Sequence, residues 1–183
     1  SHTGAMAGPD FLYDGIFKQA GIIRVRSIED LYAHGWALAT QPPLRGKRVG
    51  IVTNSGGPGT AIAYTCDQAG MEVPRLSDRL QEEIRSKIAP HASPSNPVDV
   101  TFDLSMQKLA TTLPEMIMKS GEVDAVVLHG IMHSGFMTEV FSHLRDFIGG
   151  MSFEDFLEGT RSLKGDAFDL PHKCSIPFLI SSF

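Results

Sequence analysis

Hydrophobic residues along this chain form two alternating patterns, short apolar runs and longer segments with one apolar face. The runs are rich in β-branched and other apolar residues, as in residues 123–128, and such runs predict buried strands. The strands that we expect cover residues 22–25, 48–53, 72–76, 98–100, 123–128 and 174–181. Because they alternate with helical segments, the pattern predicts an α/β fold in which helices cover both faces of a parallel sheet.

Caps and helix breakers indicate where the helices begin and end. Pro9 stands at the start of the first helix and Gly21 follows its end, while Ser27 offers an N-cap for the second. The helices that we expect cover residues 9–19, 28–38, 58–68, 77–88, 105–119 and 136–147.

Two segments interrupt the alternation. Residues 41–47 hold Pro42 and Pro43 among polar residues, which predicts a linker. Residues 149–171 are polar and contain glycines, which indicates an insertion with only a short helix at 153–157. The 183 residues therefore suit one domain with an appendage.

The segment 50–60 carries the strongest functional signal. A strand ends at Thr53, three glycines follow within residues 56–59, and Pro58 stands in the first turn of a helix. Glycines let the backbone approach a ligand, and free amides at a helix N-terminus favour anions. The loop therefore predicts a phosphate or carboxylate site made by Asn54, Ser55, Gly56, Gly57, Gly59 and Thr60. It matches neither the dinucleotide nor the P-loop fingerprint, and it also suits a plain strand-to-helix connection.

Ligands of parallel sheets bind beyond the carboxyl ends of the strands, which here brings the turns 54–60, 99–104 and 129–135 to one edge. The last of these turns predicts a second anion site with His133, Ser134 and Gly135. His129 and His133 lie four residues apart, but without an obvious third ligand we expect no metal site. Asp99 is interpreted as the cap of a turn rather than as a catalytic group.

The composition narrows the choice of function. A net charge of −5 without a basic cluster argues against nucleic-acid binding, and no apolar run reaches the ~18 residues of a membrane span. Neither a secretory signal nor a CxxC pair is present, since Cys66 and Cys174 lie far apart, and this fits a reducing cytoplasm. The chain begins with Ser1 rather than methionine, which indicates processing or a piece of a longer protein.

Four stretches together resemble the nucleoside-diphosphate-forming (NDP-forming) acyl-CoA synthetases, relatives of succinyl-CoA synthetase, and especially the ADP-forming acetyl-CoA synthetases. They are Ser-His-Thr-Gly-Ala-Met-Ala-Gly at 1–8, Phe-Lys-Gln-Ala-Gly-Ile-Ile-Arg-Val at 17–25, Val-Gly-Ile-Val-Thr-Asn-Ser-Gly-Gly-Pro-Gly at 49–59 and Pro-His-Ala-Ser-Pro-Ser-Asn-Pro-Val-Asp-Val at 90–100. The resemblance covers nearly the whole chain and is weakest across 149–171. It implies a flavodoxin-like fold of the succinyl-CoA synthetase type.

The resemblance changes the interpretation of His2. A histidine at a chain terminus is commonly a disordered residue or a vector scar. The family, however, carries a phosphoryl group on a histidine in the loop that residues 1–4 match, which implies that His2 is a covalent nucleophile. The resemblance also implies that phosphate or an organic acid binds at the loops 54–60 and 133–135.

The family's domain order implies the organisation of the chain. Residues 1–41 match the end of a first flavodoxin-like CoA-ligase domain, residues 42–47 a linker, and residues 48–183 a second such domain. The CoA-binding and ATP-grasp parts would lie elsewhere, fused or on another subunit. We therefore expect this chain alone to bind no cofactor and to be inactive, while the complete enzyme uses CoA, ATP or ADP, and Mg.

The activity that the resemblance implies is an acid–thiol ligase, which interconverts acyl-CoA, ADP and phosphate with a free acid, CoA and ATP. The partners would be phosphate, a small organic acid or acyl-CoA, and the missing domains or subunit. An alternative is a ligase-like regulatory or anion-binding module, for example in a protein acetyltransferase fusion. The presence of His2 favours the enzyme, because a sensor needs no nucleophile.

Overall fold

A computed structural model describes residues 10–101, 103, 105–131, 141, 143 and 152–182, without the side chains of 156–165 and 182. The chain divides into two compact units, residues 1–40 and 41–183. Most of the helix expected at 136–147 lies outside the described residues. Within the described ranges, no helix has the length and apolar character that crossing a bilayer requires.

The first unit contains two helices, as predicted. They are α1 (Asp10–Ala20) and α2 (Ile28–Thr40), and the hydroxyl of Ser27 accepts a hydrogen bond from the amide of Asp30 at 3.0 Å. The strand expected at 22–25 is wrong. This stretch is irregular, and within it Arg24 forms ion pairs with Asp10 and Asp14.

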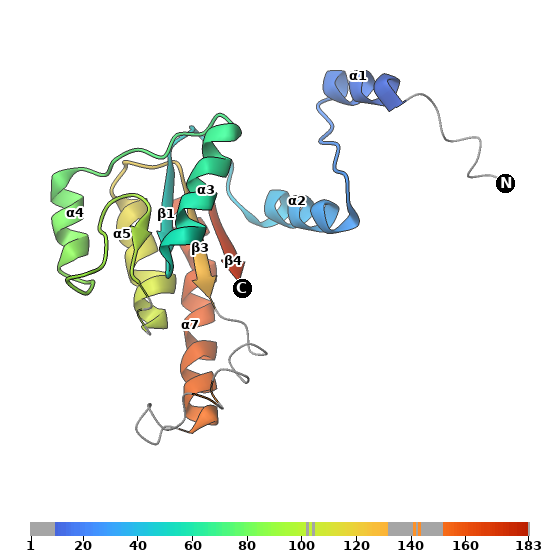
Figure 1. The fold of residues 1–183 in the computed structure, drawn as a ribbon. Helices are drawn as coiled ribbons and strands as arrows, with labels where there is room; N and C mark the ends of the chain where they lie inside the picture. The colour runs from blue at the N-terminus through green and yellow to red at the C-terminus, as the bar shows by residue number, and fades with distance from the viewer. Residues whose placement is uncertain are drawn as a thin grey trace. The chain divides into compact units, whose positions relative to one another are not determined.

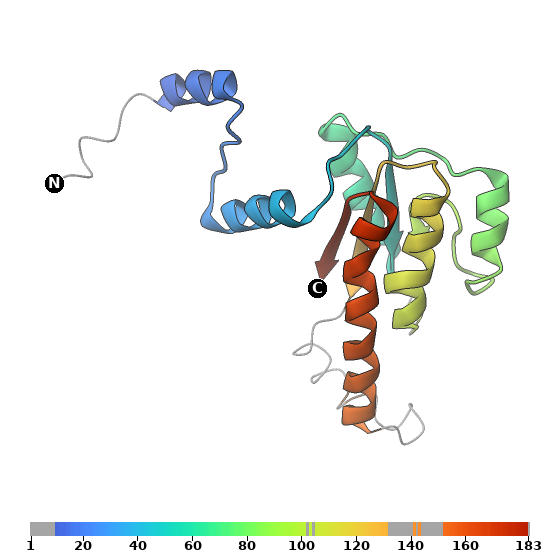
Figure 2. The same cartoon turned by 180° about the vertical axis from the view of Figure 1, so that it is seen from behind.

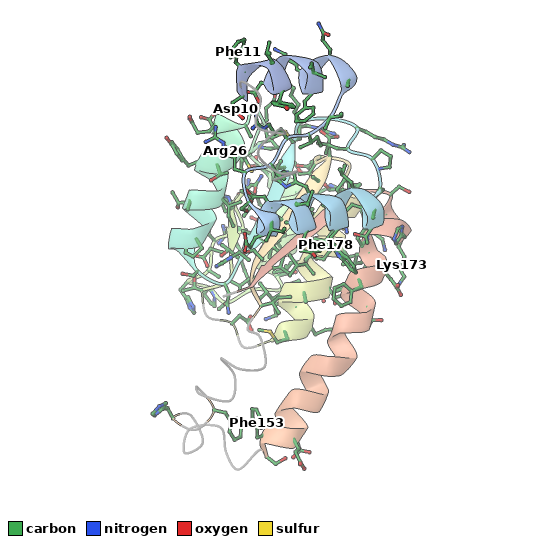
Figure 3. All side chains as sticks on the ribbon, turned by 90° about the vertical axis from the view of Figure 1, so that its right-hand side faces the viewer. Asp10, Phe11, Arg26, Phe153, Lys173 and Phe178 are labelled. Carbon is green, nitrogen blue, oxygen red and sulfur yellow. The ribbon has the colours of Figure 1, made fainter. Side chains whose placement is uncertain are left out.

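The apolar faces of these helices are exposed. No residue of α1 or α2 is buried, and Phe11 and Trp36 are 72% and 74% exposed. The side chain of Phe11 on α1 is labelled in Figure 3. The amphipathic spacing therefore predicts both helices correctly. Within the described part of the first unit, however, no other residues cover the apolar faces of α1 and α2.

The second unit is a four-stranded parallel sheet with the order β2-β1-β3-β4 (Figure 1). Its strands are β1 (Val49–Thr53), β2 (Val98–Asp99), β3 (Ala125–Ile131) and β4 (Phe178–Ser182). Helix α3 (Gly56–Gln68) covers one face, and α5 (Leu113–Lys119) and α7 (Phe153–Cys174) cover the other (Figures 1 and 2). This arrangement confirms the predicted α/β fold with helices on both faces.

Three expected elements differ from the structure. The strand at 72–76 is reduced to a single bridge between Glu72 and Arg48, and the helix expected from Ser77 is the shorter α4 (Asp78–Arg85). The helix expected at 105–119 is present, but its middle is a π-helical turn, η2 (Lys108–Thr112).

The short helix predicted at 153–157 is wrong, because α7 is one continuous helix of 22 residues. The hydroxyl of Ser152 caps its start by accepting from the amide of Asp155 at 3.0 Å. Ala167 and Leu170 are buried in the core, three residues apart on one face of the helix. Packing of this face holds a helix that its polar residues and glycines do not predict.

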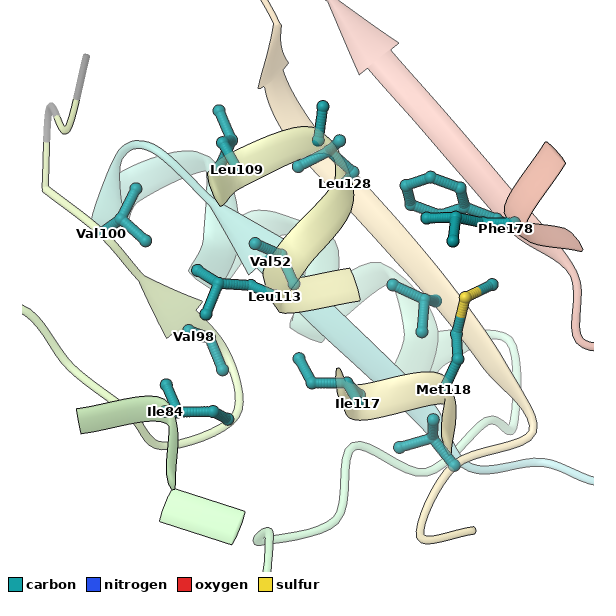
Figure 4. Packing of buried hydrophobic residues seen from close by; sticks show 14 of the residues in the cluster. Val52, Ile84, Val98, Val100, Leu109, Leu113, Ile117, Met118, Leu128 and Phe178 are labelled. Atoms are coloured by element: carbon teal, nitrogen blue, oxygen red, sulfur yellow. The ribbon is translucent and has the colours of Figure 1, made fainter. Parts of the chain in front are cut away.

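The core lies between the sheet and the layer formed by α4, α5, η2 and α7 (Figure 4). Leu113 and Ile117 from this layer are fully buried, as are Val52 and Leu128 from the central strands. Gly50 on β1 permits this contact, since a β-carbon there would lie 2.8 Å from Cγ2 of Ile117.

The side chain of Asn96 forms hydrogen bonds with the backbone of β1, on the side of β1 that faces Glu72 and β2. Its side chain accepts from the amide of Ile51 at 2.9 Å and donates to the carbonyls of Val49 at 2.9 Å and Pro74 at 3.0 Å. A side-chain amide thus takes the place of a strand residue, between the bridge at Glu72 and the pairing of β2.

Candidate functional site

The carboxyl ends of β1 and β3 form the centre of the candidate site. The connection from β1 leads to β2 on one side, whereas the connection from β3 leads to β4 on the other. The chain therefore reverses direction between these neighbours, and such a switch point is where open parallel sheets bind ligands. The starts of the predicted turns meet here. The amide of Asn54 donates to the carbonyl of His129 at 3.2 Å, and the amide of Val100 donates to the carbonyl of Thr53 at 2.9 Å.

The buried Thr53 holds the turn from β1 into α3. Its hydroxyl donates to the carbonyl of Ser55 at 2.8 Å and accepts from the amide of Ser55 at 3.1 Å. Thr53 itself is fully buried, beneath Gly59. A β-carbon on Gly59 would lie 2.8 Å from Cγ2 of Thr53, so this glycine is needed for close packing of α3 on the sheet.

The first turn of α3 leaves two amides open. Neither Gly56 nor Gly57 donates a backbone hydrogen bond to any residue that the structure describes, and both glycines are exposed. The amide of Gly59 donates within the turn, to Ser55 at 3.3 Å. Two open amides at the start of a 13-residue helix match the arrangement that binds anions.

The two hydroxyls of the predicted loop differ in whether their protons are already used inside the protein. Ser55 is the N-cap residue of α3, but its side chain forms no capping hydrogen bond. The hydroxyl of Thr60 donates to the carbonyl of Gly56 at 3.0 Å, so its proton is used inside the helix. Of the six loop residues predicted, the backbones of Gly56 and Gly57 therefore offer the clearest donors.

Asn54 is a buried polar residue at the end of β1. Its side chain is 4% exposed, and its Oδ1 has no hydrogen-bond partner among the described residues. A buried acceptor without a hydrogen bond lowers the stability of the fold unless a ligand or water donates a hydrogen bond to it. Asn54 is thus the predicted site residue whose environment most clearly calls for a ligand.

Gly130 is a residue that the sequence analysis misses. Its φ is +103°, and a β-carbon there would lie 2.8 Å from Cβ of Asn54. The glycine is therefore required twice, by its backbone conformation and by the approach of Asn54. Its only signal in the sequence is its place two residues after the predicted strand 123–128.

Other groups at this edge have more limited roles. His129 Nδ1 lies 3.2 Å from the hydroxyl of Ser181 on β4. Asp99 caps a turn as predicted, because its Oδ1 accepts from the amide of Thr101 at 2.8 Å. Away from this edge, near the C-terminal end of α3, burial raises the pKa of the Cys66 thiol.

Four of the predicted site residues, His2, His133, Ser134 and Gly135, lie outside the described residues. The structure therefore brings together the loop from Asn54 to Thr60 but does not test the histidine or the second anion site. Among the described residues, no group of three or more His, Cys, Asp or Glu side chains is placed to hold a metal ion.

Comparison with known families and proteins gives consistent matches. Residues 1–38 match the succinyl-CoA ligase-like flavodoxin domain. The chain is 40% identical over 100 residues to the alpha subunit of the ADP-forming acetate–CoA ligase II of Pyrococcus furiosus, a match that covers 55% of this chain and 22% of that subunit. It is 34% identical over 128 residues to the ADP-forming 4-hydroxybutyrate–CoA ligase of Nitrosopumilus maritimus, covering 69% of this chain and 18% of that protein.

The fold has a solved counterpart. It matches an acetyl-coenzyme A synthetase of Candidatus Korarchaeum cryptofilum that was solved in complex with phosphate and ADP. The TM-score is 0.64 and the sequences are 22% identical, and the match covers 94% of this chain and 43% of that chain. This likeness confirms the flavodoxin-like fold that the sequence predicts. The chain spans about a fifth of the length of the two curated relatives, 22% and 18%.

Proposed function

The chain is related to the NDP-forming acyl-CoA synthetases, and we propose that it forms part of an acid–thiol ligase that works through a phosphohistidine. The complete enzyme would interconvert acyl-CoA, ADP and phosphate with a free acid, CoA and ATP. The sequence matches to ADP-forming ligases support this proposal. One observation carries the proposal. The same chain contains the histidine loop at residues 1–4 and a glycine turn in which the amides of Gly56 and Gly57 donate no backbone hydrogen bond to the described residues.

In this proposal His2 carries the phosphoryl group between two substrates. Phosphate would first displace CoA from the acyl-CoA, which gives an acyl phosphate. A ring nitrogen of the imidazole would then attack the phosphorus of this acyl phosphate, the bond from phosphorus to the acyl oxygen breaks, the free acid leaves as its carboxylate, and a phosphoramidate forms. The terminal oxygen of ADP then attacks the same phosphorus, and the imidazole is restored as ATP leaves. Each transfer breaks one bond to phosphorus and forms one, so no oxidant or reductant is needed.

The residues of the second unit would hold a negatively charged substrate during this cycle. The amides of Gly56 and Gly57 are open at the helix N-terminus, and Asn54 offers a buried side-chain amide beside them in the sequence. Donors fixed by the fold stabilise negative charge without reorganising. CoA, the nucleotide and Mg would bind to parts of the enzyme beyond these 183 residues.

The test is phosphoryl transfer from radiolabelled ATP to the complete protein. Wild type should become labelled, the label should be lost in acid, and His2→Asn should abolish labelling. The matched control is His91→Asn, which removes an exposed loop histidine and should leave labelling unchanged. Labelling that persists in His2→Asn would show that another residue is the nucleophile.

A further inference from the structure

The linker, residues 41–47, is anchored to the sheet of the second unit at its first residue. Oε1 of Gln41 accepts a hydrogen bond from the amide of Phe178, the first residue of β4, at 2.8 Å. The carbonyl of Pro177 accepts from the amide of Val126 on β3 at 2.9 Å. Because the carbonyl and the amide of one trans peptide point in opposite directions, the amide of Phe178 points away from β3. Gln41 therefore binds the first backbone donor on the outer side of β4.

The end of the linker is anchored to the second unit as well. The carboxylate of Asp124, just before β3, accepts from the amide of Arg48 at 2.9 Å and forms an ion pair with its guanidinium at 2.8 Å. The carbonyl of Lys47 accepts from the amide of Glu72 at 2.8 Å. Gly46 lies so close to Asp124 that a β-carbon there would overlap the carboxylate. This end is therefore held by contacts that do not involve the first anchor.

The chain between the two anchors has little conformational freedom. Only residues 42–45 lie between them, and Pro42 and Pro43 restrict the backbone of this stretch. A linker that is anchored at both ends is part of the second unit rather than a free tether. The first unit then joins the second at residues 40 and 41, where the chain also divides into its compact units.

We propose that Gln41 is a positioning residue, which shortens the flexible connection between the two units by anchoring the linker to β4. This inference rests on the proposed function, because a short connection matters for transfer between His2 in the first unit and a substrate bound to the second. Release of Gln41 would free residues 41–45, which can extend by up to about 17 Å. A longer flexible connection lowers the effective concentration of one unit at the other.

The anchor itself is tested by limited proteolysis of the 183-residue chain with trypsin, which cleaves after Arg45 in the linker. A protease cleaves such a segment when the segment detaches locally. In Gln41→Ala, cleavage after Arg45 should be about tenfold faster than in wild type, because detachment no longer breaks this hydrogen bond. Gln41→Glu keeps an oxygen acceptor on a side chain of the same length and should restore slow cleavage. Mass spectrometry of the fragments measures the rates.

Gln68→Ala is the matched control for these variants. Gln68 is the exposed last residue of α3, and its loss should leave cleavage after Arg45 unchanged. Equal cleavage rates in wild type and Gln41→Ala would refute the anchor. Cleavage of Gln41→Glu as fast as that of Gln41→Ala would refute the role of the acceptor oxygen.

The effect on transfer is tested in the complete protein by the labelling of His2 from acetyl-CoA and radiolabelled phosphate, without ADP. Gln41→Ala should slow labelling at saturating substrate about fivefold, because the connection between the units is longer. The substrate concentrations that give half the maximal rate should stay the same, since the variant changes no group proposed to bind substrate. Gln41→Glu should restore the wild-type rate, and Gln68→Ala should keep it.

The outcomes separate the two proposals. If His2 is labelled equally fast in wild type and Gln41→Ala, the role of Gln41 is refuted while the phosphohistidine stands. If wild type takes up no label, either from phosphate or from radiolabelled ATP, the phosphohistidine of the proposed function is refuted, and the role of Gln41 with it.

Discussion

At the scale of single residues, the close fit between Gly130 and Asn54 determines the shape of the switch point. Gly130 combines a φ of +103° with a β-carbon position only 2.8 Å from Cβ of Asn54. Either β3 or the turn after β1 would have to move to admit a side chain. The position of the buried Asn54 side chain therefore depends on Gly130, which has no side chain to collide with it.

We expect Gly130→Ala to lower the free energy of unfolding by about 2 kcal/mol, from the positive φ and the contact combined. Urea denaturation measures this difference. Gly57→Ala is the control, because a β-carbon there meets nothing within 4 Å, and it should leave stability unchanged or raise it. Equal effects of the two substitutions would contradict the packing described for Gly130.

Residue types predicted the loop from Asn54 to Thr60 but not the residues that shape it. Glycine and proline act locally, so their positions after an apolar run indicate a turn and a helix start. The roles of Thr53 and Gly130 depend on strands that meet from distant parts of the chain. A single sequence holds no record of those pairings.

At the scale of elements, α5 is fixed to the sheet by direct contact with β1. Ile117 is fully buried, and its Cγ2 lies against Gly50. Helix α5 and the π-helical turn η2 before it thus belong to the core layer under the central strands. This layer supports β1 and β3, whose carboxyl ends form the candidate site.

Ile117→Ala should reduce the free energy of unfolding by about 3 kcal/mol, because it removes buried methyl groups and leaves a cavity. Denaturation with urea, followed by circular dichroism, tests the value. Leu44→Ala, at a side chain that is 49% exposed, serves as the control and should cost less than about 1 kcal/mol. A loss at Ile117 no larger than that at Leu44 would contradict the assignment of α5 to the core.

Helices and strands were predictable where burial and local pattern agree. β1, β3 and α3 follow from apolar runs and from glycine and proline positions. The stretch 22–25 has the composition of a strand but no partner strand among the described residues, and α7 is helical despite a polar sequence. In both cases tertiary contacts, which a sequence pattern does not contain, decide the outcome.

At the scale of the whole molecule, the two units differ in what holds them together. The second unit has a buried core, whereas α1 and α2 contain no buried residue. Isolated helices of 11 and 13 residues are marginal in water without packing. We therefore expect the first unit, residues 1–40, to be less stable than the second.

Hydrogen exchange should show this difference in the 183-residue chain. Amides of β1 and β3 should exchange at least about a thousandfold more slowly than those of α1 and α2, because only the strands need extensive unfolding to exchange. Mass spectrometry of peptides from the two units measures the ratio. Similar protection in both units would contradict the expected difference in stability.

Asn96 has a consequence for how the protein behaves in concentrated solution. Unpaired backbone groups along an outer strand invite pairing with another molecule. By filling the gap between two short stretches of pairing with its own amide, Asn96 leaves the middle of β1 no vacant groups to offer to a foreign strand. A single side chain thereby completes the hydrogen bonding of β1 over the residues that the two-residue strand β2 is too short to pair.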